Sequence, residues 1–175
     1  KDKELFLFFR THAGHIGITG KVSVIRSKDG VNWSEPIIAG QGETDIRNPA
    51  VGIKSDGSFI LACHKYDTYY GEGDIVNRRD PRSKSTMVFY NSNKKGENWQ
   101  EFEPIFEDIS RDPSPHEKII RHEGRLLLPT YGGSDTFVYF SEDDGNTWGK
   151  RSLISHGFHE PALTVNKEGD LVAAL

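Results

Sequence analysis

The sequence predicts an all-β fold, and three observations lead to this prediction. Short runs rich in Val, Ile, Phe and Leu alternate with turns rich in Gly, Asp, Asn and Pro, while helical periodicity is scarce. One phrase, Ser-x-Asp-x-Gly-x-Thr-Trp, recurs in three places, each time after such a run. A second phrase, an acidic residue followed by Gly, separates matched pairs of runs. Repeats at this spacing are typical of a stacked or radial architecture.

The tryptophan phrase is clearest at residues 141–148 (SEDDGNTW), and a copy one residue shorter occupies 27–33 (SKDGVNW). A third copy, 92–99 (SNKKGENW), has Lys94 in the aspartate place. Ser and Asp side chains accept hydrogen bonds from backbone N–H groups inside such a turn, and Gly supplies a backbone shape that other residues resist. Trp covers the hairpin with a large apolar face. We therefore interpret the phrase as structural.

The acidic-Gly turns lie between runs that are expected to pair as antiparallel strands. The expected pairs are 50–54 with 58–64, 118–121 with 125–130, and 162–166 with 170–175. Each unit then runs as inner strand, acidic-Gly turn, second strand, loop, third strand, tryptophan turn and outer strand. Four antiparallel strands in this order form one blade of a β-propeller.

Residues 1–175 are therefore expected to form a single partial β-propeller domain. The predicted parts are blades at 47–107 and 116–154, the last three strands of an earlier blade at 4–39, and the start of a later blade at 160–175. These parts amount to about three blades, whereas propellers close with about four to eight. We expect the chain to be a piece of a larger propeller, with the remaining blades as its partners.

Composition excludes several classes of function. The 175 residues carry a formal net charge of −4, which gives no electrostatic attraction to nucleic acid. No apolar run approaches membrane-spanning length, so no membrane partner is expected. Cys63 is the only cysteine, which excludes an internal disulfide. The sequence does not distinguish a cytoplasmic protein from a secreted one. It gives no sign of a cofactor.

Three polar loops precede the predicted inner strands, each with charge beside a proline. They are 45–49 (DIRNP), 111–117 (RDPSPHE) and 156–161 (HGFHEP). A charged side chain at the start of an apolar strand is energetically costly unless it is solvated, paired with an opposite charge or used in binding or catalysis. Because the inner strands of a propeller converge on its channel, we expect these loops to share a polar site. Their candidate residues are Asp45, Arg47, Asn48, Arg111, Asp112, His116, His159 and Glu160.

Further candidates end the predicted second strands, namely Arg10, His64 and Tyr131. His12 and His15 follow Arg10, but no fixed ligand spacing supports a metal site, so no metal is predicted. The polar stretch 67–83 has two interpretations, a solvated loop or a lid over a substrate.

The tryptophan phrase resembles the Asp-box, or BNR repeat, of the sialidase (neuraminidase) superfamily. The strand 124–131 (GRLLLPTY) is similar to the strand before a later Asp-box in those enzymes, and 159–163 (HEPAL) is similar to the segment with their catalytic glutamate. Asn48-Pro49 resembles the start of their second blade, and Arg10 stands where they place an arginine. The resemblance covers almost the whole chain and implies a six-bladed propeller that hydrolyses terminal sialic acid glycosides.

The resemblance also implies residue roles. In that family three arginines clamp the sugar carboxylate, a tyrosine activated by a glutamate is the nucleophile, and an aspartate is the acid/base. Glu160 corresponds to the glutamate, Arg10 to a substrate-contacting arginine and Asn48 to a sugar-contacting position. The loop 11–20 departs from the pattern because it holds no aspartate. His15 is its nearest titratable residue and is therefore a candidate acid/base.

Two functional hypotheses follow. The first is a sialidase-like glycoside hydrolase that removes a terminal sugar from glycans, with Glu160 and His15 as catalytic residues. The alternative is a non-catalytic glycan-binding or interaction propeller. The isolated segment is expected to be inactive, since residues from other blades would complete the pocket. The predicted carbohydrate-binding residues are Arg10, Asp45, Arg47, Asn48, His64, Arg111, Asp112, His116, Tyr131 and His159.

Overall fold

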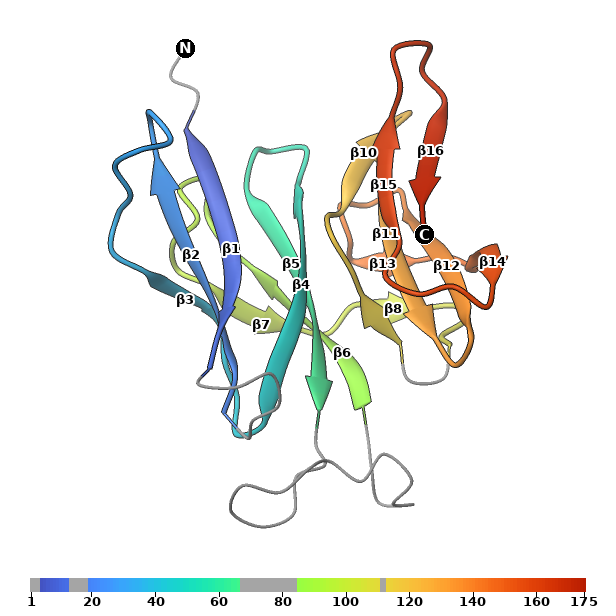
Figure 1. The fold of residues 1–175 in the computed structure, drawn as a ribbon, viewed down its shortest axis with the longest axis horizontal. Coiled ribbons are helices and arrows are strands. Elements are labelled where there is room, and N and C mark those ends of the chain that lie inside the picture. Colours follow the sequence, from blue (N-terminus) through green and yellow to red (C-terminus); the bar gives the residue numbers. More distant parts are fainter. Residues whose placement is uncertain (1–3, 13–18, 67–84, 111–112) are drawn as a thin grey trace.

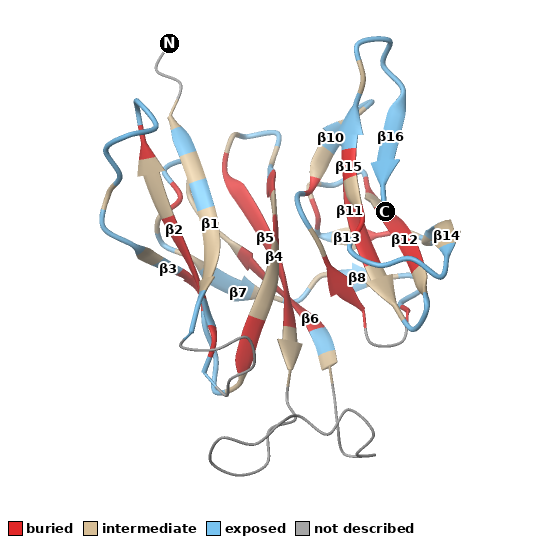
Figure 2. Cartoon of the chain, viewed as in Figure 1, coloured by how far each residue is buried: buried red, intermediate tan, exposed pale blue. Residues whose placement is uncertain are grey.

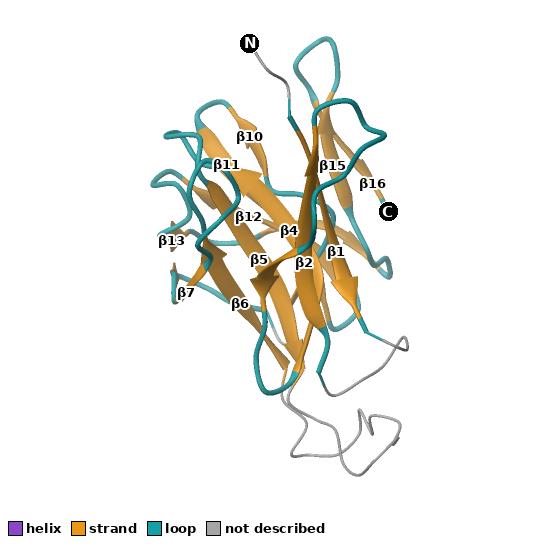
Figure 3. Cartoon of the chain, turned by 90° about the vertical axis from the view of Figure 1, so that its left-hand side faces the viewer, coloured by secondary structure: helices purple, strands orange, loops and turns teal. Residues whose placement is uncertain are grey.

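The computed structural model describes residues 4–12, 19–66, 85–110 and 113–175, and this part of the chain is all β, without a helix. Three sheets follow one another in chain order, and a hairpin closes the series (Figure 1). In the view turned by 90°, the long strands of the three sheets run in similar directions (Figure 3). None of the described ranges contains a helix that could cross a membrane.

The sheets are antiparallel, and their long strands neighbour one another in chain order. The first contains β1 (Leu5–Thr11), β2 (Lys21–Ser27) and β3 (Ile37–Gly40). The second contains β4 (Asp45–Ile53), β5 (Phe59–Tyr66), β6 (Ser85–Asn91) and β7 (Gln100–Phe102). The third contains β10 (Ile120–His122), β11 (Arg125–Gly132), β12 (Asp135–Ser141) and β14 (Ser152–His156), with β9 (Ser114–Pro115) also paired to β11. The closing hairpin is β15 (Ala162–Val165) and β16 (Leu171–Ala174).

The predicted acidic-Gly hairpins are confirmed, because β4 pairs with β5, β10 with β11, and β15 with β16. The strand order predicted for the two complete units is also observed, since β4-β5-β6-β7 and β10-β11-β12-β14 each follow chain order, with β13 (Thr147–Trp148) between β12 and β14 paired elsewhere. One pairing was not predicted. The short strands β8 (Ile105–Phe106) and β13 pair in parallel, which ties the end of the second unit to the tryptophan turn of the third.

The hydrogen bonds expected within the tryptophan turns are present. In residues 141–148, Ser141 Oγ accepts from the Gly145 N–H at 2.8 Å and Asp143 Oδ1 accepts from the Thr147 N–H at 2.8 Å. The turn 27–33 has the same plan, and Asp29 Oδ1 accepts from two successive backbone N–H groups.

The third tryptophan turn corrects the sequence interpretation. Lys94 stands in the aspartate place, but its neighbour Asn93 performs the capping. Asn93 Oδ1 accepts from the N–H groups of Lys95 and Glu97, both at 3.0 Å. A neutral amide therefore replaces the carboxylate one position earlier in the chain.

The tryptophans of the three turns differ in burial. Trp148 is fully buried and stacks on Phe106 with ring centroids 6.3 Å apart. Trp99 packs edge-on against Phe8 at 5.7 Å. Trp33, in contrast, is 39% exposed.

The second sheet is buried on both faces, which explains the continuous apolar run in β5. Successive side chains of a strand point to opposite faces. Ile60 and Ala62 belong to a core shared with the third sheet, whereas Leu61 and Cys63 belong to a core shared with the first. Figure 2 shows this burial concentrated in the central strands.

The edges of the second and third sheets touch through their first strands. The Ile119 N–H donates to the Val51 carbonyl at 2.9 Å, and Val51 forms a parallel bridge with Lys118. Gly52 permits this approach, because a Cβ there would lie only 2.7 Å from the Ile119 Cβ. The contact brings the start of β4 and the segment before β10 to the same place, and the candidate site lies there.

Candidate functional site

An ion pair lies at the ends of β1 and β4. Arg10 donates to Asp45 Oδ1 from Nε at 2.9 Å and from a terminal nitrogen at 2.7 Å. The Asp45 side chain is fully buried, and Arg47 NH1 lies 3.9 Å from its other oxygen. One buried carboxylate thus orients two guanidinium groups, which would otherwise repel each other. The buried Asp45 side chain faces Arg10, and its contact with a ligand stays a prediction.

Asn48 occupies a bulge in β4. The β4–β5 register shifts between Arg47 and Ala50, and Asn48 has φ of 50°. Asn tolerates this left-handed conformation better than most residues. The bulge turns the side chain toward the third sheet, where Asn48 Nδ2 donates to Ser114 Oγ at 2.8 Å and to the Tyr131 hydroxyl at 3.1 Å.

Three aromatic side chains meet around the end of β11. Tyr131 stacks on His159 with ring centroids 5.2 Å apart and an angle of 28° between planes. His116 lies edge-on to Tyr131 at 6.2 Å. The three rings come from segments far apart in the sequence, so they join the loop before β10, the end of β11 and the loop before β15.

Two glutamates at the site have strained backbones. Glu117 has φ of 62° and Glu160 has φ of 58°, and both side chains are exposed. A non-glycine residue in this conformation costs about 1–3 kcal/mol, and such residues cluster at functional sites. Glu117 and Glu160 stand just before the inner strands β10 and β15, and Asn48 lies at the bulge within the inner strand β4.

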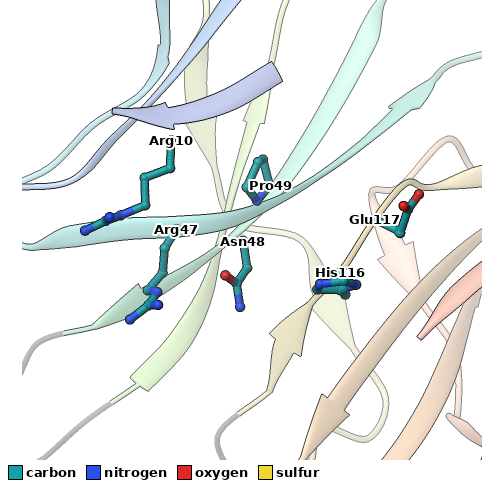
Figure 4. Close-up of a pocket in the computed structure, with 6 residues that line it drawn as sticks. All are labelled: Arg10, Arg47, Asn48, Pro49, His116 and Glu117. Carbon is teal, nitrogen blue, oxygen red and sulfur yellow. The ribbon is translucent and has the colours of Figure 1, made fainter. Parts of the chain in front are cut away.

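These residues line two adjoining cavities. The first, of about 460 Å³, is lined by Arg10, Arg47, Asn48, Pro49, His116 and Glu117. The second, of about 450 Å³, is lined by Arg47, Asn48, His64, Tyr66, Ser85, Ser114, Tyr131, Gly132, Gly133, His159 and Glu160. Arg47 and Asn48 belong to both, so the cavities meet there. Figure 4 shows Arg10 and Arg47 on one side of the first cavity, His116 on the other and Asn48 between them, while the Glu117 carboxylate points away from the arginines.

The structure brings most of the predicted residues together. Arg10, Arg47, Asn48, His64, His116, Tyr131, His159 and Glu160 line the joined cavities. His64 is 7% exposed and its ring lies 4.9 Å from that of Tyr66. Predicted residues His15, Arg111 and Asp112, and the whole polar stretch 67–83, lie outside the described residues. The placement makes a shared site geometrically possible, and the roles of the residues stay predictions.

Sequence reasoning missed several lining residues. Pro49 and Glu117 stood inside loops that were singled out, but neither was named as a candidate. Ser114 had a usable signal, because it lies between two prolines in one of the polar loops. Tyr66, Ser85, Gly132 and Gly133 carried no such signal, since they are ordinary residues at strand ends.

The chemical capacity of the site follows from these groups. Two oriented guanidinium groups suit a carboxylate or another planar anion. Amide, hydroxyl and imidazole groups suit the hydroxyls of a sugar, and Glu160 supplies a carboxylate for proton transfer. Within the described ranges no cluster of three or more His, Cys, Asp or Glu side chains could hold a metal ion.

Comparisons with known proteins identify the fold. No protein-family model matches the chain, and no curated protein matches its sequence. A protein of unknown function from Dyadobacter fermentans has a similar structure, with a TM-score of 0.75 and 19% identity over 97% of this chain. The NanB sialidase from Streptococcus pneumoniae, in complex with 2-[(3-chlorobenzyl)ammonio]ethanesulfonate, is similar with a TM-score of 0.65 and 13% identity over 90% of this chain.

A second NanB structure, a K499G mutant, gives a TM-score of 0.64 at 14% identity. The chain spans 57% of the length of the Dyadobacter protein and 43% of NanB. At these identities the comparisons show the fold alone. The chain therefore has a sialidase-like all-β fold.

Proposed function

We propose that the three sheets and the closing hairpin are successive blades of a β-propeller and that the joined cavities bind a carbohydrate for glycoside hydrolysis. The observation that carries this proposal is the meeting of Arg10, Arg47 and Glu160, from three separate segments, around one pair of connected cavities. The sialidase-like fold supports it, as does the burial of the second sheet on both faces, which neighbouring blades require. The Ser-Asp-Gly-Trp turns would then be Asp-boxes.

Each group has a part in this proposal. Arg10 and Arg47 bind an anionic group of the sugar, with Asp45 holding both guanidinium groups in place. Asn48, His64, His116 and Tyr131 contact its hydroxyls from the cavity walls. Glu160 acts in proton transfer, because it is the exposed carboxylate that lines the second cavity.

The substrate class is a sugar acid at the end of a glycan, as sialic acid is. Two arginines beside one cavity favour a carboxylate over a neutral sugar, since a charge-assisted pair of hydrogen bonds is stronger than a neutral one. The NanB structure was solved with a ligand that bears a sulfonate, which is also an anion.

The test uses aryl glycosides, including an aryl sialoside, with the full-length propeller that contains this segment and with its Glu160→Gln variant. We expect cleavage of the sialoside, and a loss of turnover of about 100-fold or more in Glu160→Gln, because the amide cannot transfer the proton. Calorimetry with N-acetylneuraminic acid should show nearly unchanged affinity in the same variant. Glu142→Gln, in an exposed turn, is the matched control. Equal turnover in Glu160→Gln and wild type would remove Glu160 from the mechanism.

A non-catalytic glycan-binding propeller is the second candidate. The orientation of Glu117 favours it, because its carboxylate points away from the arginines and Glu160 is the one other carboxylate among the described lining residues. Binding of N-acetylneuraminic acid that is lost in Arg47→Ala, without cleavage of any aryl glycoside, would select this alternative.

A further inference from the structure

The carboxylate of Glu160 is not fixed by its own contacts. Within the described residues, no hydrogen bond or ion pair reaches its oxygens, and its side chain is exposed. Its backbone conformation, with φ of 58°, is one that Glu rarely adopts. A strained residue stays in place only when its surroundings hold it. The position of Glu160 must therefore come from the segment that carries it.

That segment is anchored at three points to residues 131–135, which comprise the end of β11, the turn and the first residue of β12. The Gly157 N–H donates to the Ser134 carbonyl at 2.7 Å. His156 Nδ1 lies 2.9 Å from Asp135 Oδ1. His159, directly before Glu160, stacks on Tyr131. The His156–Asp135 pair is exposed and contributes little, so the Gly157 hydrogen bond and the His159 stack hold the segment.

Tyr131 also connects to the opposite wall of the site. Its hydroxyl accepts from Asn48 Nδ2, and Asn48 is adjacent to Arg47. The ring of Tyr131 thus contacts the glutamate-bearing segment, while its hydroxyl contacts the arginine-bearing strand. Tyr131→Phe removes the hydroxyl alone, and Tyr131→Leu removes the ring together with the hydroxyl, so a comparison of the two variants isolates the role of the ring.

We propose that Tyr131 is a positioning residue that holds the Glu160 segment through its ring and Asn48 through its hydroxyl. The structural part of this proposal needs no ligand. Its chemical consequence rests on the proposed function, because only a hydrolase has a turnover for Glu160 to support. The ring then determines turnover, and the hydroxyl determines the affinity of the arginine side of the site.

The structural part is tested by hydrogen exchange of the Gly157 amide. This amide is protected only while its hydrogen bond to the Ser134 carbonyl is formed. Losing an aromatic pair should raise its exchange rate about two- to tenfold in both Tyr131→Leu and His159→Ala. Tyr131→Phe keeps the ring and should exchange at nearly the wild-type rate. His159 is exposed, so His159→Ala tests the same stack even if Tyr131→Leu does not fold.

The matched control is His122→Ala, which removes a histidine from β10 in the same sheet. A Gly157 exchange rate in His159→Ala no higher than in the control would overturn the proposal. Double substitution of Tyr131 and His159 should add nothing to the larger single effect, since both remove one contact. Fully additive effects would also overturn it.

The chemical part is tested with the aryl sialoside. Tyr131→Leu should lower kcat about tenfold relative to Tyr131→Phe, because only Tyr131→Leu loses the aromatic contact with His159. Both variants lose the hydroxyl, so both should raise KM to a similar degree. Equal kcat in the two variants would show that the ring does not position Glu160 for catalysis. If the full-length wild-type protein cleaves no glycoside, the proposed function fails, and the exchange experiment still decides whether Tyr131 holds the segment.

Discussion

At the scale of single residues, a glycine leaves room for the ion pair beneath the site. A Cβ on Gly20 would lie 1.8 Å from Asp45 Oδ1 and 2.6 Å from Arg10 Nε, which no real contact permits. Gly20→Ala must therefore displace the carboxylate or the guanidinium. We expect a loss of about 1–3 kcal/mol in the free energy of unfolding, measured by chemical denaturation, and weaker binding of N-acetylneuraminic acid, measured by calorimetry.

The control for this prediction is Gly149→Ala. A Cβ on Gly149 would meet its nearest atom at 3.7 Å, an ordinary contact, so stability and binding should stay close to wild type. If Gly20→Ala behaved like Gly149→Ala, the ion pair would not depend on the missing side chain.

Individual residues also show which features of the site cannot be predicted from the sequence. Charge beside proline predicted that Arg47 and Glu160 belong to polar loops that meet, and both line the joined cavities. The same reasoning made Asp45 a contact for ligand, whereas its side chain is buried against Arg10. Residue type cannot separate these cases, because a carboxylate at a strand end serves equally as a ligand contact or as a support.

At the scale of elements, the aspartates of the tryptophan turns make the fold sensitive to acid. Hydrogen bonds from Asn32 and Val31 lower the pKa of Asp29 well below its ordinary value. At Asp143, partial burial raises the pKa, but hydrogen bonds from Thr147 and Ser141 outweigh it, and the net pKa is lowered. A lowered folded-state pKa stabilises the fold above the unfolded value of about 4. That stabilisation is lost as the pH falls through the folded-state pKa.

We therefore expect the melting temperature to fall as the pH is lowered below about 4, and to fall less steeply in Asp143→Asn. Asp143→Asn should also melt lower than wild type at pH 7, because an amide is a weaker acceptor for the Thr147 N–H. Thermal denaturation followed by circular dichroism across this pH range measures both effects. Glu142→Gln, one residue away, is the comparison, and an identical pH profile in Asp143→Asn would contradict the assignment.

The elements themselves were largely predictable. Acidic-Gly turns between apolar runs located three hairpins, because turn chemistry and strand pairing act locally. The parallel pairing of β8 with β13 could not be found in this way. It joins residues 105–106 to 147–148, and its partners are selected by the burial of Trp148 against Phe106 rather than by any nearby turn.

At the scale of the whole molecule, the site depends on how closely two sheets approach. The Ile119–Val51 hydrogen bond joins the second and third sheets beside the cavities, and Asn48 crosses the same boundary to reach Ser114 and Tyr131. A repeat count predicts that such sheets are neighbours, but it does not give their separation. That distance is set by side-chain volume at the contact, and here Gly52 opposite Ile119 makes it small.

Gly52→Ala should therefore act on the site from a distance. A Cβ at position 52 would lie 2.7 Å from the Ile119 Cβ and 3.1 Å from its carbonyl oxygen, so the sheets must separate. We expect a loss of about 1–3 kcal/mol in the free energy of unfolding and weaker binding of N-acetylneuraminic acid. Ile119→Gly removes both the Cβ and the Cγ2 that the new side chain would meet, and the double variant should recover part of both losses. A double-mutant cycle by denaturation and calorimetry measures the coupling, and strictly additive effects would mean that the separation of the sheets does not control the site.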